Sequence, residues 1–179
     1  MRAAPEKRIW TIGHSTRSLD EVCALLRAHD IEALVDVRSS PSSRHCPQWD
    51  RAAIVAALPD WLRYRWAPQL GGRRRPTLDS AVNGAWRNAS FRGFADYMQG
   101  AAFAAGLDEL LAEAGSARLA IMCSEAVWWR CHRSLIADAL TARGCAVIHI
   151  MEGGDDEHHL RDFAAVRGLT VVYPAARRE

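Results

Sequence analysis

The chain has 179 residues, of which 49% are hydrophobic, and its formal net charge is only +2 at pH 7. This length accommodates one domain with a full hydrophobic core, and so small a net charge gives no sign of binding to nucleic acid or membranes through overall charge. Residues 1–7 are polar and no apolar stretch is long enough to span a bilayer, so we expect a cytoplasmic protein with no membrane partner.

The five cysteines are an odd number, and their spacing is not that of a secreted disulfide framework. Cys23 lies in the apolar stripe of a predicted helix and Cys145 begins an apolar run, so both are expected in the core. Lys7 is the only lysine, and arginine therefore carries nearly all the positive charge. Genome composition alone accounts for such a bias, but the arginine fork also recognises phosphate and carboxylate.

The first forty residues predict a strand, a helix and a second strand. "RIWTIGHS" is an apolar run that stops at Gly13, as a buried strand entering a turn does. In "SLDEVCALLRAHD", Ser18 and Glu21 have the spacing of a capping box ahead of a helical apolar stripe. "IEALVDVRSSP" is a second apolar run that ends in a polar loop. A strand–helix–strand unit indicates a parallel sheet.

The middle of the chain is less regular. "PQWDRAAIVAALP" predicts a short helix ended by Pro59, and "LRYRW" alternates as a third strand does. "LGGRRRPTLDSAVNG" is a Gly- and Arg-rich loop that we expect to be mobile. "FRGFADYM" and "FAAGLDELLAEAG" carry apolar residues at helical spacing, which predicts two helices or one helix broken near Gly100.

The remaining segments predict two further central strands around a helix. "ARLAIMCSE" and "CAVIHI" are apolar runs, and "CHRSLIADALTARG" between them predicts a helix that ends near Gly144. "GGDDEHHLRDFAAVRG" suggests a last helix and "LTVVYP" a final strand. We therefore expect a single α/β domain over residues 1–179, with a mainly parallel, doubly wound, Rossmann-like sheet of about five strands and helices on both faces.

Reactive side chains follow three of the predicted strands, at the point where each apolar run stops. Ligands of open parallel α/β sheets bind beyond the carboxyl ends of the strands. Strand ends are polar in any protein, but that does not account for the mixture of imidazole, carboxylate, guanidinium and thiol found here. We therefore expect one cleft at one edge of the sheet. Its expected lining residues are His14, Asp36, Arg38, Cys123, Glu125 and His132.

Several of these segments resemble the domain of unknown function 488 family. The resemblance is carried by "TIGHSTRSLDEVCALLRAHDIEALVDVRSSPSSRHCPQWD", "QLGGRR", "IMCSEAVWWRCHRSLIADAL" and "VIHI", from Trp10 to Ile150. It implies a cytoplasmic α/β protein with a core of about residues 10–150 and a variable tail over residues 151–179, and no settled activity. The motif positions that it marks are His14, Ser15, Asp36, Arg38, Pro41, Ser43, Gly71, Gly72, Cys123, Glu125, Cys131, His132 and Arg133.

One interpretation of the segment from Met122 to Asp138 is a thiol nucleophile. Cys123 ends a predicted strand shortly before a helix, and a cysteine near a helix N-terminus and arginines has a lowered pKa. Phosphatases and rhodaneses place an arginine six positions after the cysteine, whereas Arg130 follows Cys123 by seven. A buried structural thiol is the alternative.

A second interpretation is a zinc or iron site. Cys123, Cys131, His132 and His14 supply ligand atoms of suitable softness. Their spacing matches no zinc ribbon or finger. The run from Asp155 to His159 is a poorer candidate, because acidic residues at the start of a helix also favour its dipole.

A third interpretation is an anion site at the start of the predicted helix. Backbone N–H groups and the helix dipole favour negative charge there, and Arg133 would add a bidentate contact. The alternative is that the arginines pair with Glu125 or Asp36. Gly71, Gly72 and Arg73 could fold over the site as a lid. The expected anion-binding residues are Arg38, Arg130, His132, Arg133, Ser15, Ser43, Gly71 and Gly72.

These features favour an enzyme that acts on a phosphate-bearing substrate, such as a nucleotide, nucleoside or nucleic-acid component. The expected catalytic residues are Cys123, Glu125, Asp36 and His14. A non-catalytic nucleic-acid-binding module remains open, because "GGRRR", "WLRYRW" and the pair Trp128 and Trp129 could contact phosphates and stack on bases. A metal-binding protein is the other alternative. The sequence indicates no particular cofactor and no oligomeric state.

Overall fold

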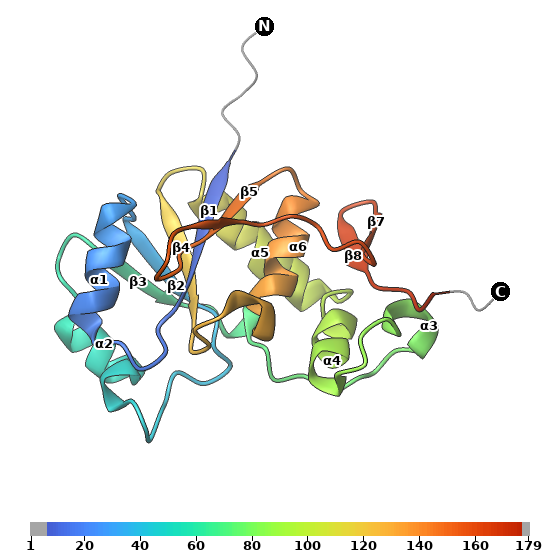
Figure 1. The fold of residues 1–179 in the computed structure, drawn as a ribbon, viewed down its shortest axis with the longest axis horizontal. Helices are drawn as coiled ribbons and strands as arrows, with labels where there is room; N and C mark the ends of the chain where they lie inside the picture. Colours follow the sequence, from blue (N-terminus) through green and yellow to red (C-terminus); the bar gives the residue numbers. More distant parts are fainter. Residues whose placement is uncertain (1–6, 177–179) are drawn as a thin grey trace, which may run out of the picture.

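A six-stranded sheet organises the computed structural model, which describes residues 7–176. The strand order is β3-β2-β4-β1-β5-β6, and every neighbouring pair is parallel except β5 with β6. This confirms the predicted α/β class and the mainly parallel sheet (Figure 1). The strands of this sheet are β1 (Arg8–Gly13), β2 (Ala33–Asp36), β3 (Arg63–Trp66), β4 (Leu119–Cys123), β5 (Ala146–His149) and β6 (Asp156–Glu157).

The central strands are buried on both faces, which explains why they appear in the sequence as continuous apolar runs. All residues of β2 and β4 are buried, as is β1 after Arg8. The parallel register places Gly13 beside Cys123 and Asp36 beside Met122. The ends of β1, β2 and β4 therefore meet at one edge, as expected from the sequence.

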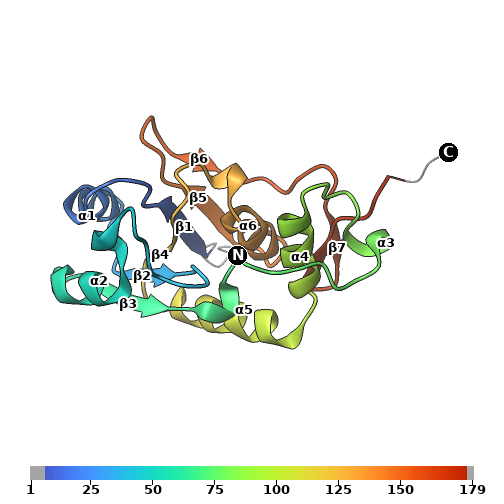
Figure 2. The same ribbon diagram turned by 90° about the horizontal axis from the view of Figure 1, so that it is seen from below.

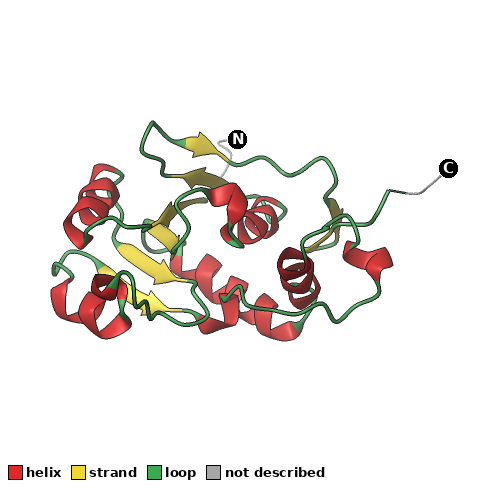
Figure 3. Ribbon diagram, turned by 60° about the horizontal axis from the view of Figure 1, so that its bottom comes forward, coloured by secondary structure: helices red, strands yellow, loops and turns green. Residues whose placement is uncertain are grey.

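Helices cover both faces of the sheet (Figures 2 and 3). One hydrophobic cluster joins a face of the sheet to α1 and α2, and a second joins the opposite face to α4, α5 and α6. The predicted capping box at Ser18 and Glu21 is present, and Gly100 separates α4 from α5. The helices are α1 (Leu19–Ala28), α2 (Arg51–Ala57), α3 (Ser80–Asn83), α4 (Ala89–Tyr97), α5 (Ala101–Glu113) and α6 (Arg133–Thr141).

Short 3-10 turns punctuate the loops between these elements. They are η1 (Pro47–Trp49), η2 (Pro68–Leu70) and η3 (Trp128–Arg130).

None of the helices within residues 7–176 is long and apolar enough to cross a membrane. No disulfide links the five cysteines, and Cys145 lies in the core as expected.

The predicted last helix over residues 153–168 is wrong. The segment instead forms β6, a loop, and β7 (Ala165–Arg167), which pairs with β8 (Thr170–Val172) in a separate hairpin. The hairpin turns at Gly168, whose positive φ of 63° glycine adopts without strain. The backbone N–H of His158 bonds to Val147, so tertiary contacts outweigh the helical spacing of the apolar residues.

Candidate functional site

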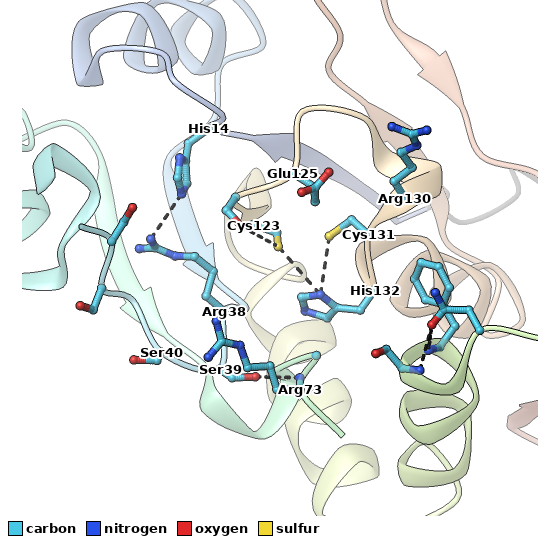
Figure 4. A pocket seen from close by; sticks show the side chains of 17 residues that line it. His14, Arg38, Ser39, Ser40, Arg73, Cys123, Glu125, Arg130, Cys131 and His132 are labelled. Carbon is cyan, nitrogen blue, oxygen red and sulfur yellow. Dashed lines mark hydrogen bonds between the residues drawn. The ribbon is translucent and has the colours of Figure 1, made fainter. Parts of the chain in front are cut away.

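A pocket of about 610 Å³ opens where β1, β2 and β4 end (Figure 4). Five of the six residues expected to share a cleft line it, namely all but Asp36. The loop after β2 and the segment before α6 form much of the wall. The lining consists of His14, Arg38, Ser39, Ser40, Ser42, Ser43, Gly72, Arg73, Asn88, Ser90, Phe91, Cys123, Ser124, Glu125, Arg130, Cys131 and His132.

Two thiols and an imidazole form a cluster at the inner end of this pocket. Cys123 ends β4, whereas Cys131 and His132 lie immediately before α6. The Nδ1 atom of His132 lies 3.6 Å from Sγ of Cys131 and 3.9 Å from Sγ of Cys123. Both cysteines are buried and all three ligand atoms lie within 4.8 Å of one another. We refer to these residues as the thiol–imidazole cluster.

The orientation of the His132 ring is set from outside the cluster. Its Nε2 lies 2.8 Å from the carbonyl oxygen of Val37, and a carbonyl only accepts, so Nε2 carries the proton. Nδ1 is consequently unprotonated in the neutral ring and directs its lone pair toward the two sulfur atoms. Gly72 packs so closely that a Cβ there would lie 2.5 Å from Nδ1, so only glycine fits beside the ring.

The two thiols differ in acidity. The pKa of Cys123 lies well below its usual value because Cys131 donates a hydrogen bond to its sulfur. Burial raises the pKa of Cys131, and the neighbouring Cys123 raises it further. Cys123 is therefore the more acidic thiol of the pair, with Cys131 as its donor.

The opposite wall is built around Arg38, whose charge is already paired. Its Nε and Nη2 bond to the two carboxylate oxygens of Asp36, at 2.9 and 2.6 Å. Tyr64 also donates to Asp36, which is fully buried behind the wall. Asp36 thus holds Arg38 in place, and its position does not suit the acid–base role expected from the sequence.

His14 is a neutral element of the same wall. Nδ1 donates to the carbonyl of Ser15 at 2.8 Å, and Nε2 accepts from Nη1 of Arg38 at 3.3 Å. Burial, opposed by the bond to Ser15, lowers its pKa to about 4. Its ring stacks on Trp49 with centroids 4.5 Å apart. His14 lies across the pocket from the thiol–imidazole cluster and is not part of the group of metal-ligand atoms that the cysteines and His132 form.

Arg133 does not face the pocket, contrary to the expected bidentate anion contact. Its side chain is fully buried, and it donates to the carbonyl of Glu125 at 2.7 Å and to Oγ1 of Thr11 at 3.3 Å. The side chain turns from the start of α6 toward β1, where it supports the loop after Cys123. Ser15 and Gly71 also lie outside the lining; Gly71 packs against Ser39.

The mouth of the pocket carries the charges without partners. Arg73 and Arg130 are exposed, and within residues 7–176 neither guanidinium has a hydrogen-bond or ion-pair partner. Figure 4 shows them on opposite sides of the thiol–imidazole cluster. Glu125 is the only carboxylate of the lining. The mouth is therefore basic and rich in hydroxyl groups from the serines around it.

Sequence reasoning missed a second polar cluster, buried beside the sheet. Thr11 contacts Nδ1 of His149 at 2.7 Å, His149 contacts His158 at 3.0 Å, and Nε2 of His158 lies 2.8 Å from Asp138. Arg161 and Tyr173 also donate to Asp138. We call this set the buried histidine network. Its members lie up to 162 residues apart in the chain, and the only local signal was the run around His158, which suggested a solvated helix.

Trp128 and Trp129 have different environments. Trp128 stacks on His149 with ring centroids 4.2 Å apart and donates to Asp156 at 2.9 Å. Trp129 is 50% exposed. Only Trp129 presents an open face for stacking.

The comparisons with known proteins identify the family. A family model described as "Domain of unknown function DUF488" matches residues 18–140. The chain belongs to this family. The matched segment runs from the cap of α1 to the end of α6, and so it contains the thiol–imidazole cluster and both exposed arginines. Comparisons with curated proteins and with solved structures gave no match.

Proposed function

We propose that this DUF488 protein is an enzyme that acts on a phosphate-bearing substrate in the pocket at the ends of β1, β2 and β4. One observation carries the proposal: the unpaired guanidinium groups of Arg73 and Arg130 flank a pocket that two thiols and an imidazole also line. Arginine binds phosphate oxygens through a planar pair of donors. Serine hydroxyls around the same mouth add further donors.

The roles within the pocket follow from what each side chain already contacts. Cys123 is the more acidic of the two thiols, and a thiolate is the form that both nucleophilic catalysis and metal binding require. Glu125 is exposed, and its carboxylate pairs with no described residue. Arg38 shapes the wall, because Asp36 neutralises its charge. Arg73 and Arg130 are therefore the anion-binding residues of this proposal.

The nucleic-acid-binding alternative has weaker support. Arg65 pairs with Glu113, and Arg74 stacks on Tyr97 with its guanidinium 3.7 Å from the ring centroid. Two of the arginines that suggested a nucleic-acid surface are thus occupied by intramolecular contacts. A pocket also suits a small phosphate-bearing molecule better than an extended backbone.

Isothermal titration with pyrophosphate and a panel of nucleotides tests the proposal. We expect binding that weakens about ten- to hundredfold in Arg130→Gln and in Arg73→Gln, the scale of a charge-assisted hydrogen bond. Arg167→Gln, which removes an exposed arginine on β7, is the matched control and should bind as the wild type does. Equal binding by all three variants, or no binding by the wild type, would overturn it. Mass spectrometry of the bound compounds after incubation detects turnover.

A further inference from the structure

We propose that Cys123, Cys131 and His132 bind one divalent transition-metal ion of the zinc type, with the fourth coordination position open to the pocket. The metal site stands on its own geometry. Its use as the place where substrate binds rests on the proposed function. Three protein ligands and one open position are the arrangement of catalytic zinc sites, whereas structural sites are closed by four.

Two distances within the thiol–imidazole cluster are close to those of a tetrahedral site. With metal–sulfur and metal–nitrogen distances of about 2.3 and about 2.0 Å, an ideal tetrahedral angle separates sulfur from nitrogen by about 3.5 Å. The observed separations from Nδ1 are 3.6 Å for Cys131 and 3.9 Å for Cys123. All three ligand atoms lie within 4.8 Å of one another, so small movements of the side chains allow them to bind one metal ion.

The surroundings of the ligands are also those of a metal site. Ligating histidines commonly donate their other ring N–H to a backbone carbonyl, which fixes the tautomer. His132 does this with Val37, so that Nδ1 is the free ligand atom. The backbone N–H of Arg133 lies 3.5 Å from Sγ of Cys131 and can donate to it. The buried side chain of Arg133, whose Nε has no partner among the described residues, adds positive charge behind the thiolates.

The ligand set points to a particular class of metal. Two thiolates and an imidazole favour zinc, or iron of similar ligand preference, over magnesium and calcium, which take oxygen ligands. Two thiolates also cancel the charge of a divalent ion, which suits a buried site. His14 is not in the set, because Arg38 and Ser15 engage both of its ring nitrogens. Water or an oxygen atom of the substrate would occupy the fourth coordination position.

Metal analysis of the untagged full-length protein tests the proposal. We expect about one zinc ion per chain by native mass spectrometry and elemental analysis, and uptake of zinc after chelation and dialysis. Cys131→Ser and His132→Asn should each lower zinc affinity at least about tenfold, since even second-shell changes cost that much. Cys23→Ser, which removes a half-buried thiol outside the cluster, is the control and should retain the metal.

Cobalt(II) added to the metal-free protein gives a second readout that does not depend on the stability of the variants. Wild-type protein should show sulfur-to-cobalt charge-transfer bands and intense tetrahedral ligand-field bands. A protein that binds neither ion, that keeps zinc in Cys131→Ser and His132→Asn, or that joins Cys123 to Cys131 in a disulfide when isolated with its native metal supply would overturn the proposal. Phosphate binding that depends on Arg130 would survive that outcome, so the two proposals fail separately.

Discussion

The thiol–imidazole cluster and the buried histidine network are both groups of polar side chains beside the same sheet, but only the network is held by short hydrogen bonds between nitrogen and oxygen atoms. In the network the protons can be assigned along the whole chain. Nε2–H of His158 donates to Asp138, Nε2–H of His149 donates to His158, and the hydroxyl of Thr11 donates to His149. Every donor has an acceptor, as stable buried polar groups require.

The cluster is different because Nδ1 of His132 contacts only sulfur atoms, which form weak hydrogen bonds. These two contacts measure 3.6 and 3.9 Å, and all three residues line the pocket. Short hydrogen bonds among buried groups stabilise a fold, whereas weakly bonded ligand atoms beside a cavity are available to bind a metal ion. The hydrogen-bond partners therefore distinguish the two regions, although both contain histidines.

The largest expected effect is on the network. Asp138→Ala should destabilise the protein by about 3–5 kcal/mol, because it leaves Arg161 and His158 without the buried carboxylate they contact. Chemical denaturation measures this loss. Zinc content and pyrophosphate binding should be unchanged while the variant is folded. A loss below about 1 kcal/mol would mean that the network does not stabilise the fold.

Acid should weaken the network through His149. Burial lowers the pKa of His149 from its ordinary 6.5 to about 2, and the charges of Arg133 and Arg161 act in the same direction. Between these values the unfolded chain binds a proton that the folded protein does not. The contribution of His149 is thus complete above about pH 6.5 and is lost as pH falls, by about 1.4 kcal/mol per pH unit.

Denaturation curves between pH 7 and pH 5 check this, with His149→Asn as the comparison. Other groups titrate in the same range, so the informative quantity is the difference between the two slopes. The free energy of unfolding of the wild type should fall more steeply with decreasing pH than that of His149→Asn. The difference between the slopes should correspond to at most one additional proton bound on unfolding. Parallel slopes would contradict the assignment of His149 as neutral in the folded protein.

A smaller effect on stability is expected at Gly13. This residue pairs with Cys123 of the cluster and lies on the same strand as Thr11 of the network. A Cβ at this position would lie 1.7 Å from the carbonyl oxygen of Glu125, whose loop follows Cys123. Gly13→Ala should therefore displace the loop and cost about 1–3 kcal/mol, the scale of overpacking. Because Cys123 moves with the loop, zinc affinity should also fall. Gly115→Ala, at an exposed position where a Cβ meets its nearest atom at 3.1 Å, is the control.

The contrast between the two regions also explains what the sequence could predict. Apolar runs that stop at Gly13, Asp36 and Cys123 predicted the strands and the edge where their ends meet, because burial on both faces requires such runs. The side on which Arg133 leaves the start of α6 depends on its contacts with Thr11 and Glu125, and no local pattern encodes these. The buried histidine network was missed for the same reason.

The wrongly predicted helix over residues 153–168 shows the same limit of sequence patterns. Apolar residues between Leu160 and Val166 have helical spacing, yet His158 and Tyr173 bond to Asp138 across the chain and hold the segment extended. The spacing of apolar residues indicates which side chains share one face of an element. It does not reveal a hydrogen-bond partner that lies in another element. Eight of the thirteen motif positions line the pocket, but the resemblance assigns none of them a role.

The smallest effect on stability and the sharpest on function are expected at Glu125. Its side chain is exposed and pairs with no described residue, so Glu125→Gln should change the free energy of unfolding by no more than about 0.5 kcal/mol. The carboxylate is nevertheless the only one that lines the pocket. Turnover of a phosphate-bearing substrate should therefore fall, whereas zinc content stays the same. Removing the negative charge should also leave pyrophosphate binding equal or tighter. Parallel thermal melts, metal analysis and turnover assays separate these effects, and an active Glu125→Gln enzyme would exclude Glu125 as the proton-transfer group.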